Sequence, residues 1–170
     1  RDGGTSWQNV TPKNLPESQI NMVEVSPHDP ATAYIAVTRY KFDDFTPDID
    51  KTENYGKQWK RMVNGIAPQA FVRVVREDPV RKGLLYAGTE AGMYVSFNDG
   101  GVWQPLQLNL PQVPITDLRV HSGDLLASTQ GRSFWILDDI TPLEQLDAAT
   151  AKEQLHIFKP KPTYRVWTAG

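Results

Sequence analysis

The sequence predicts an all-β fold: a β-propeller of four-stranded antiparallel blades, of which this chain contains about three to three and a half. One observation is a turn motif, hydroxyl-x-Asn-x-Gly-x-x-Trp, that recurs along the 170 residues. A second is that β-type apolar runs return at the same step as the motif. A third is that little sequence is left for helices before Thr141. Repeats of this length are typical of propeller blades.

The turn motif occurs in three copies that share one register. Two complete copies run from Thr52 to Trp59 and from Ser96 to Trp103, and the later part of a third runs from Asp2 to Trp7. Trp59 follows Trp7 by 52 residues, and Trp103 follows Trp59 by 44. These steps lie near the ~40 to 50 residues of one blade. Because the chain begins within a motif, we expect further blades upstream.

Each motif residue has a structural role that explains its type. The glycine permits a positive φ in a tight turn, and the Asn, Asp, Ser or Thr side chain bonds turn amides. The tryptophan ring then packs over the turn and between neighbouring sheets, where its burial removes about 150 to 250 Å² from water. We therefore expect fold-stabilising roles for Asp2, Gly4, Trp7, Thr52, Asn54, Gly56, Trp59, Ser96, Asn98, Gly100 and Trp103.

The flanking β-type runs divide the chain into units. First strands are expected at 20–25, 71–76 and 115–120, second strands at 33–37, 84–88 and 124–128, and third strands at 93–97 and 133–137. The predicted division is a partial blade at 1–13, blades at 14–63 and 64–108, a last blade at 109–140 and a C-terminal segment at 141–170. In that segment we expect a capped helical turn at 141–146 and an Ala-rich helical stretch at 148–154. Runs 155–158 and 164–167 either complete the last blade or lead into a following domain.

At these motifs the chain resembles the Asp-box propellers, or bacterial neuraminidase repeats. That group includes sialidases, xyloglucanase-like glycoside hydrolases and sortilin-type receptor propellers. The resemblance covers roughly residues 1–140, with Asn54 and Asn98 where the group usually has Asp. An amide oxygen accepts the same turn bonds, so the fold is unaffected. The run from Arg132 to Asp139 looks like the close of the array in large secreted glycosyl-hydrolase-like proteins. The resemblance implies a fragment of such a protein, secreted or periplasmic.

Composition excludes several classes of function. Lys and Arg total 18 against 20 Asp and Glu, and the signs are interspersed, which argues against nucleic acid or anionic membranes as partners. No segment approaches the ~20 apolar residues of a membrane span. The chain has no cysteine, so disulfides and thiolate metal sites are absent.

Candidate binding residues lie on the face opposite the motif turns. In a four-stranded blade, the turns between strands one and two share a face with the motif turns, and the remaining loops form the other face. The resemblance to sialidases implies that this second face holds the ligand. Thr38, Thr89 and Thr129 align before its loops, which predicts comparable positions for the residues after them. The candidates for a polar, sugar-like or peptide ligand are Arg39, Tyr40, Lys41, Asp48, Gln130 and Arg132. A solvated rim without a ligand is the alternative.

Acidic residues of the same loops are the candidates for catalysis or metal binding. Glycoside hydrolysis usually needs two facing carboxyl groups, and Asp43, Asp44 and Glu90 are candidates whose partners could lie in missing blades. Asp43, Asp44, Asp48 and Asp50 are alternatively calcium ligands, although their spacing lacks a dedicated loop pattern. The three histidines are scattered, so no zinc site is expected, and no cofactor is otherwise indicated.

Two functional hypotheses follow. The first is a binding or scaffold surface of an extracytoplasmic propeller that docks a protein, peptide or glycan. The second is part of a glycoside hydrolase whose cleft is completed by other blades. The lack of an assignable catalytic pair favours binding. The expected partners are the remaining blades of the same propeller, because an isolated set of blades exposes apolar sheet faces and unpaired edges.

Overall fold

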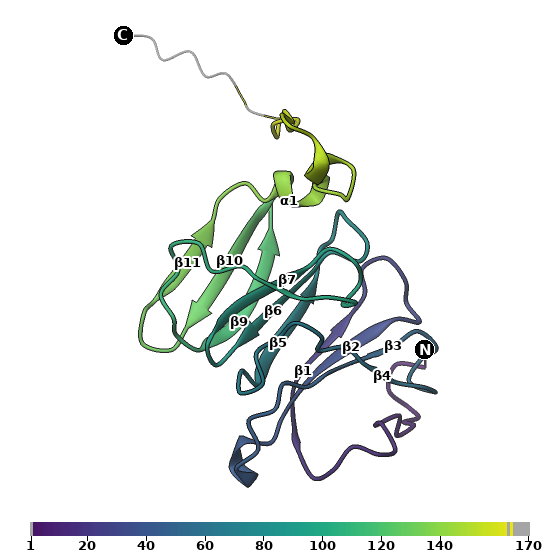
Figure 1. Ribbon diagram of the computed structural model, residues 1–170. Helices are drawn as coiled ribbons and strands as arrows, with labels where there is room; N and C mark the ends of the chain where they lie inside the picture. The colour runs from purple at the N-terminus through teal and green to yellow at the C-terminus, as the bar shows by residue number, and fades with distance from the viewer. Residues whose placement is uncertain (1, 163, 165–170) are drawn as a thin grey trace.

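The computed structural model describes residues 2–162 and 164 and contains three antiparallel sheets arranged in a row (Figure 1). The first sheet consists of β1 (Gln19–Val25), β2 (Ala33–Thr38), β3 (Ile49–Thr52) and β4 (Lys60–Arg61). The second consists of β5 (Val72–Glu77), β6 (Leu85–Thr89), β7 (Gly92–Ser96) and β8 (Gln104–Pro105). The third consists of β9 (Ile115–His121), β10 (Asp124–Thr129) and β11 (Phe134–Leu137).

In every sheet the strands pair in chain order, so each sheet is a meander, as a propeller blade requires. The all-β prediction and the part-propeller architecture are confirmed. The described part of the chain has no strand near either end, and of the two interpretations of residues 155–158, completion of the last blade is not seen. Residues 2–18 contain no strand, and residues 155–158 form none that completes the third sheet. Residues 165–167 of the last expected run lie outside the described residues.

Helical structure is confined to short turns. They are η1 (Tyr40–Phe42), α1 (Thr141–Gln145) and η2 (Thr150–Lys152). α1 falls where a capped turn is expected, and η2 occupies only three residues of the Ala-rich stretch. Arg81 ties this segment to the second sheet, because its Nη1 donates to the carbonyls of Leu143 (2.8 Å) and Leu146 (2.5 Å).

The cores lie between neighbouring sheets. One apolar cluster joins the first and second sheets and includes Tyr34, Ile49 and Trp103. The other joins the second and third sheets and includes Tyr86 and Leu125. Every residue of β6 and β7 is buried, because the second sheet is covered on both faces. Packing of each sheet against the next therefore supplies the hydrophobic stabilisation of the fold.

The motif turns have the hydrogen bonds that the sequence predicts. Thr52 and Ser96 accept from the amides of Gly56 (2.9 Å) and Gly100 (3.0 Å) with their hydroxyl oxygens. The side-chain oxygens of Asn54, Asn98 and Asp2 each accept from the amide four residues later, at 2.9 Å in every case. The same chemistry thus closes all three turns, including the one at the N-terminus.

Two of the three motif tryptophans connect their unit to the one before it, whereas Trp7, which we expect from the sequence to pack between sheets, is 91% exposed. Trp103 is 2% exposed, and its Nε1 donates to the carbonyl of Met62 at 2.9 Å. Trp59 donates in the same way to the carbonyl of Val10 at 2.7 Å. Met62 and Val10 each lie three residues after a motif tryptophan. The segment that contains Val10 therefore packs against the first sheet. In the same way, the end of the first sheet packs against the second sheet.

Gly100 shows how close this approach is. Its φ is +78°, and a Cβ there would meet the Cε of Met62, so a side chain is excluded by both conformation and space. Gly56 has the same relation to Val10. The motif glycine is thus required by the contact between units as well as by the turn.

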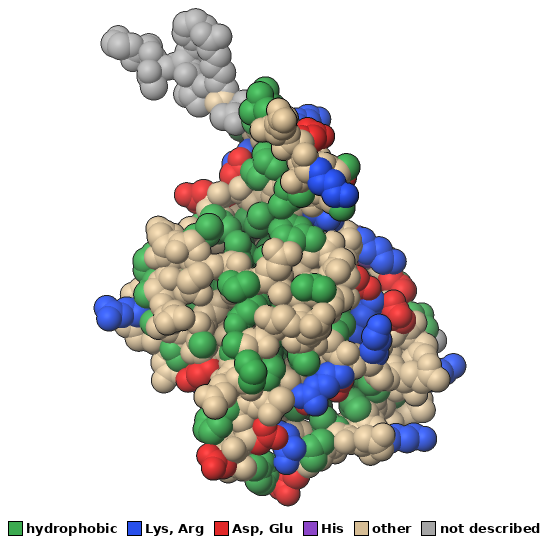
Figure 2. All heavy atoms as spheres, in the orientation of Figure 1, with side chains coloured by type: hydrophobic (Ala, Val, Ile, Leu, Met, Phe, Trp, Pro, Cys, Tyr) green, Lys and Arg blue, Asp and Glu red, His purple; other side chains and the backbone are tan. Residues whose placement is uncertain are grey.

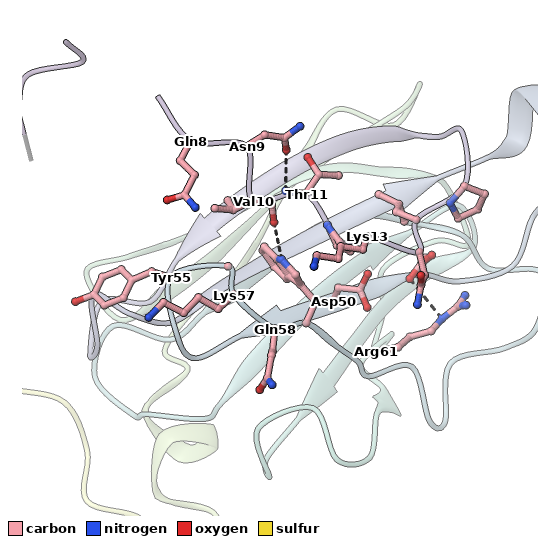
Figure 3. A pocket seen from close by; sticks show the side chains of 17 residues that line it. Gln8, Asn9, Val10, Thr11, Lys13, Asp50, Tyr55, Lys57, Gln58 and Arg61 are labelled. Atoms are coloured by element: carbon pink, nitrogen blue, oxygen red, sulfur yellow. Dashed lines mark hydrogen bonds and ion pairs between the residues drawn. The ribbon is translucent and has the colours of Figure 1, made fainter. Parts of the chain in front are cut away.

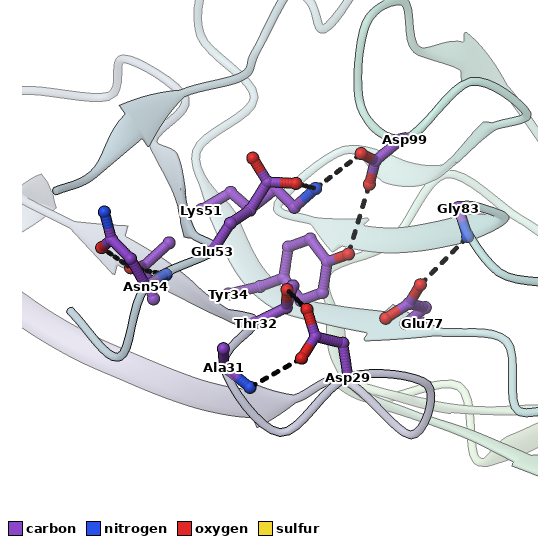
Figure 4. A network of polar contacts seen from close by, with 11 residues as sticks. Asp29, Ala31, Thr32, Tyr34, Lys51, Glu53, Asn54, Glu77, Gly83 and Asp99 are labelled. Carbon is purple, nitrogen blue, oxygen red and sulfur yellow. Dashed lines mark hydrogen bonds and ion pairs between the residues drawn. The ribbon is translucent and has the colours of Figure 1, made fainter. Parts of the chain in front are cut away.

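Polar contacts also cross between sheets. Arg76 of β5 donates to Glu24 of β1 (2.6 Å) and to Asp117 of β9 (2.8 Å), so it joins the first strands of all three sheets. Near the motif turns, Asp99 of the motif Ser96–Trp103 accepts two hydrogen bonds from the first sheet (Figure 4). Lys51 Nζ donates to its Oδ2 at 2.5 Å, and the Tyr34 hydroxyl donates to its Oδ1 at 3.3 Å. Burial raises the pKa of Tyr34, with Glu77 and Asp99 adding to the effect, so its hydroxyl stays a donor.

Replacement of Trp103 tests this packing. Trp103→Ala should lower the free energy of unfolding by about 3 to 5 kcal/mol, because it leaves a cavity and an unpaired carbonyl at Met62. Urea unfolding followed by circular dichroism measures the change. The neighbouring Val102→Ala, whose side chain is 42% exposed, should change stability by about 0.5 kcal/mol or less. Equal effects of the two variants would contradict the account.

Candidate functional site

The sheets present two different loop faces. On the first, each motif turn contacts the turn between strands one and two, as in the bond from the Asp99 amide to the Gly83 carbonyl at 2.8 Å. On the second, the loop between strands two and three contacts the chain that enters strand one. There the amide of Glu90 donates to Phe71 (3.1 Å) and that of Gln130 to Pro114 (2.9 Å). The structure thus separates the turn-building motif from the face predicted to bind a ligand.

The alignment of three threonines on this second face is only partly right. Thr89 and Thr129 hold equivalent positions, opposite the first residues of β5 and β9. In the first sheet the register change falls so that Val37 takes this position, opposite Ile20. Thr38 is therefore equivalent to Glu90, and Arg39 lies one residue farther along the loop.

An aromatic ledge spans the first and second sheets on this face. We define it as Tyr40, Phe42, Phe45 and Phe71. Tyr40 stacks on Phe71 with ring centroids 5.3 Å apart and planes at 17°, and Phe45 lies 6.1 Å from Phe71. Phe71 is 3% exposed, whereas Tyr40, Phe42 and Phe45 are 38%, 50% and 43% exposed. The buried Phe71 ring thus supports the half-exposed rings of Tyr40 and Phe45, and Phe42 belongs to the same loop, at the end of η1.

Two ion pairs flank the aromatic ledge. Arg39 contacts Asp44 at 3.2 Å within the long loop, and Arg73 contacts Glu90 at 2.6 Å on the second sheet. The Arg73 guanidinium also lies 5.2 Å from the Phe71 ring centroid. Hydrogen bonds from Thr46, with the nearby Arg39 charge, hold the pKa of Asp44 below its usual value. Both acids therefore act as partners of arginines, and the lowered pKa of Asp44 opposes proton donation by that carboxyl group at neutral pH.

The remaining candidates are spread over the face. Lys41 and Asp43 are exposed on the long loop, and Asp43 has a left-handed φ of 59° at the end of η1. Gln130 and Arg132 are exposed on the corresponding turn of the third sheet. The structure brings Arg39, Tyr40 and Asp44 together with Glu90, and it leaves Gln130 and Arg132 on a separate sheet.

A polar groove lies beside the first sheet, between residues 8–16 and strands β3 and β4 (Figure 3). Its cavity volume is about 1460 Å³, and its lining includes Asp48, Asp50, Trp59 and Arg61. Asp48 is 9% exposed, and its Oδ1 lies 3.4 Å from Arg61 Nε, too far for a well-formed hydrogen bond. Burial raises the pKa of Asp48 to about 6, against the Arg61 charge and with help from Asp50. Burial also raises the pKa of Asp50.

The structure gives no support to a calcium site at the four aspartates of this region. Within residues 2–162 and 164, no three His, Asp or Glu side chains are grouped so that they could hold a metal ion. Asp44 pairs with Arg39, and Asp48 faces Arg61. In the same described part of the chain, no helix has the length and hydrophobicity needed to cross a bilayer.

Comparison with known proteins shows the fold. No protein-family profile and no curated protein sequence matches the chain. Among solved structures, YCF48 bound to D1 peptide superposes with a TM-score of 0.56 at 20% identity, covering 81% of this chain and 43% of that one. YCF48 from Cyanidioschyzon merolae gives 0.55 at 17% identity, with 82% and 45% covered. The GH74 enzyme of Niastella koreensis gives 0.55 at 16% identity, with 71% and 21% covered.

These neighbours are propeller proteins, and the chain shares their fold. It spans less than half the length of each. Identities this low carry the architecture and no residue roles.

Several residues of the aromatic ledge and of the polar groove are not identified by the sequence alone. Phe71 and Arg73 were assigned only to a β-strand, because their contact with the long loop arises from the stacking of two sheets. Asp50 was considered only as a calcium ligand, although it shares a sheet face with Arg61, its cross-strand partner. Alternation within the run Asp48-Ile49-Asp50 is a signal that could have placed both acids on one face.

The buried Asp48 predicts an unusual pH dependence of stability. Its pKa is about 6 in the folded protein against 3.8 in the unfolded chain, so the folded state binds the extra proton between these values. Its contribution to stability is full below about pH 4 and is lost as the pH rises to about 6. Asp48→Asn should therefore raise the free energy of unfolding at pH 7 by about 1 to 2 kcal/mol and flatten this loss.

Denaturant unfolding at pH 4 and pH 7 measures the effect. Asp44→Asn is the matched control, because the lowered pKa of Asp44 predicts stability that is present at neutral pH and lost in acid. Destabilisation of Asp48→Asn at pH 7, as for the control, would show that Asp48 is not in an unfavourable site.

Proposed function

We propose that this chain contributes a ligand-binding surface of an extracytoplasmic propeller, centred on the aromatic ledge, and that its ligand is a peptide or a glycan. The observation that carries the proposal is the half-exposed Tyr40 ring stacked on the buried Phe71 of the next sheet. A ring fixed in this way loses little conformational freedom when a ligand packs on it.

The chemistry of the ledge suits such ligands. Flat aromatic faces favour the apolar face of a sugar ring or an apolar peptide side chain. The adjoining Arg39–Asp44 and Arg73–Glu90 pairs offer donors and acceptors at fixed positions for hydroxyl or amide groups. These partly exposed ion pairs make a polar rim around an apolar centre, which is the usual anatomy of an interface.

Two neighbours provide the ligand classes to be tried. One solved structure is titled as YCF48 bound to D1 peptide, and another as a GH74 xyloglucanase from Xanthomonas campestris, with 15% identity and a TM-score of 0.51. A peptide and a branched glucan are therefore the two probes of choice. Location outside the cytoplasm belongs to the same proposal and rests on the resemblance of the motifs.

Replacement of Tyr40 tests the ledge. We expect Tyr40→Ala to weaken binding of the recognised probe by about 3- to 10-fold, the effect of losing one aromatic contact. Isothermal titration calorimetry with xyloglucan oligosaccharides and with a peptide library measures it. Tyr164→Ala is the matched control, since that side chain is 95% exposed and lies outside the sheets. Unchanged affinity of Tyr40→Ala would remove the ledge from the site.

The alternative function is glycoside hydrolysis in the polar groove beside the first sheet. It is favoured by one observation, the pKa of about 6 at Asp48, because a general acid needs a raised pKa. Asp50 supplies a second carboxyl group in the same groove, and Trp59 supplies an aromatic wall. Of the acids suggested by sequence, Asp44 and Glu90 lie instead in ion pairs with Arg39 and Arg73, and Asp43 is exposed on the long loop.

A turnover assay separates the two functions. If the chain acts in hydrolysis, release of reducing sugar from xyloglucan should fall by about 100-fold or more in Asp48→Asn, which cannot donate a proton. Glu90→Gln, as the control, should keep the activity. Absence of any turnover by the wild-type protein, together with binding to the ledge, would eliminate the hydrolase alternative.

A further inference from the structure

Within residues 2–162 and 164, the third sheet has no fourth strand of the kind that the other two sheets possess. Strands β3 and β7 pair on their outer edges with β4 and β8, the short strands that follow Trp59 and Trp103. β11 pairs with β10 alone within the described residues, so its outer edge is unpaired. Unpaired edges recruit further strands, because their backbone groups lack partners. The edge runs along Phe134 and Ile136, which are 81% and 58% exposed.

A small groove next to this edge has the lining of a motif-tryptophan site. It lies between the second and third sheets, with a cavity volume of about 40 Å³, and its walls include Leu106, Leu110 and Trp135. Leu106 and Leu110 follow Trp103 by the same intervals at which Met62 and Ile66 follow Trp59. Met62 and Ile66 are the residues that pack with Trp103 in the first core. The groove is therefore the position where a further motif tryptophan belongs.

The N-terminal segment contains a motif tryptophan that is not buried between sheets. Trp7 is 91% exposed, although the Asp2 turn before it is already closed by bonds to the amides of Gly4 (3.2 Å) and Ser6 (2.9 Å). Val10, three residues later, already sits against the first sheet as Met62 sits against the second. This segment is a motif turn followed by the positions that form the outer strand in the other two motif-containing units.

Exposed apolar side chains occur on the outer faces of the two terminal sheets. The first sheet exposes Ile20, Val23 and Val25 to 39%, 60% and 60%, and the third exposes Phe134 and Ile136. Figure 1 shows these sheets at opposite ends of the row, and Figure 2 shows apolar side chains among the charged ones on the visible face. The residues of β7 that correspond to Phe134 and Ile136, namely Met93 and Val95, are buried against the next sheet.

We propose that two copies of this chain associate head to tail, and that the segment from Asp2 to Val10 of each copy completes the third sheet of the other. Trp7 enters the groove beside Leu106, and the first sheet of one copy covers Phe134 and Ile136 of the other. Two copies with three sheets each give six blades, within the about four to eight of closed propellers. In a ring of two copies, the outer edge of β11 and the exposed apolar faces of the first and third sheets are covered.

The register of the new strand pair follows from the second sheet. There Tyr94 pairs with Pro105 and Val95 with Gln104, which lie two and one residues after Trp103. Trp135 faces Ala127 as Tyr94 faces Ala87, so β11 and β7 are equivalent. The expected partners of Trp135 and Ile136 are thus Asn9 and Gln8 of the second copy.

The fit requires one local adjustment. A volume of about 40 Å³ holds only part of an indole, so Leu108 moves outward when Trp7 enters. Leu108 is 70% exposed and has a φ of 45°, so it contributes little packing in its present position. The chain spans 43% and 45% of the two YCF48 chains, so two copies approach the extent of one such propeller.

Engineered cysteines test the proposal in a chain that has none of its own. In the double variant Gln8→Cys, Ile136→Cys, directly opposed strand positions come within disulfide distance only across two copies. Oxidation should give a covalent dimer on non-reducing gels, and light scattering should give twice the 19.1 kDa chain mass. Adding Trp7→Ala should lower the dimer yield at least about 10-fold.

The matched control is Gln8→Cys, Val80→Cys, because Val80 is 70% exposed on a turn of the second sheet and outside the proposed contact. It should remain uncrosslinked. Circular dichroism confirms that each variant is folded. A folded Gln8→Cys, Ile136→Cys protein that stays monomeric, crosslinks within one chain or forms open-ended polymers would overturn the two-copy ring.

Discussion

The structure depends on one repeated contact, in which a motif tryptophan donates its indole N–H to the backbone carbonyl at the end of the preceding unit. At Trp103 the bond to Met62 is buried, so both the ring area and the hydrogen bond contribute. A residue with a side chain does not fit at position 100, because the Met62 side chain occupies the space that its Cβ would need. The contact sets the distance between the first and second sheets. The bond from Trp59 to Val10 repeats it one unit earlier.

This constraint also decides where function is possible. The polar side chains of the motif, such as Asn54 and Asn98, are occupied by turn amides, and Asp99 is occupied by Lys51 and Tyr34 of the neighbouring sheet. The loops of the opposite face do not contain these turn motifs. Its long loop after β2 is free to place Tyr40 on the next sheet, where a half-exposed ring meets two arginine–carboxylate pairs. A rigid stack of sheets thus supports the loop face on which we propose that a ligand binds.

The sequence predicts local features well and contacts between sheets poorly. Strand positions, turn chemistry and the separation of the two faces follow from alternation, from Gly and Asn in fixed spacing, and from repetition. The exposure of Trp7 cannot be predicted in this way, because burial of its side chain depends on a neighbouring sheet rather than on its motif. The roles of Phe71 and Arg76 and the raised pKa of Asp48 likewise arise from packing between units. The equivalence of Thr38 with Thr89 failed because β1 and β2 form one more pair, Gln19 with Thr38, before the register change, so that Val37 holds the position of Thr89.

Hydrogen exchange of the tryptophan indole protons tests the repeated contact most directly. Nuclear magnetic resonance resolves each indole N–H, and exchange of a buried, bonded proton requires local opening of the sheets. The account predicts the slowest exchange at Trp103, with Trp59 also protected through its bond to Val10. Exchange of the Trp103 indole proton as rapid as that of a free indole would contradict the claim that this bond joins the blades.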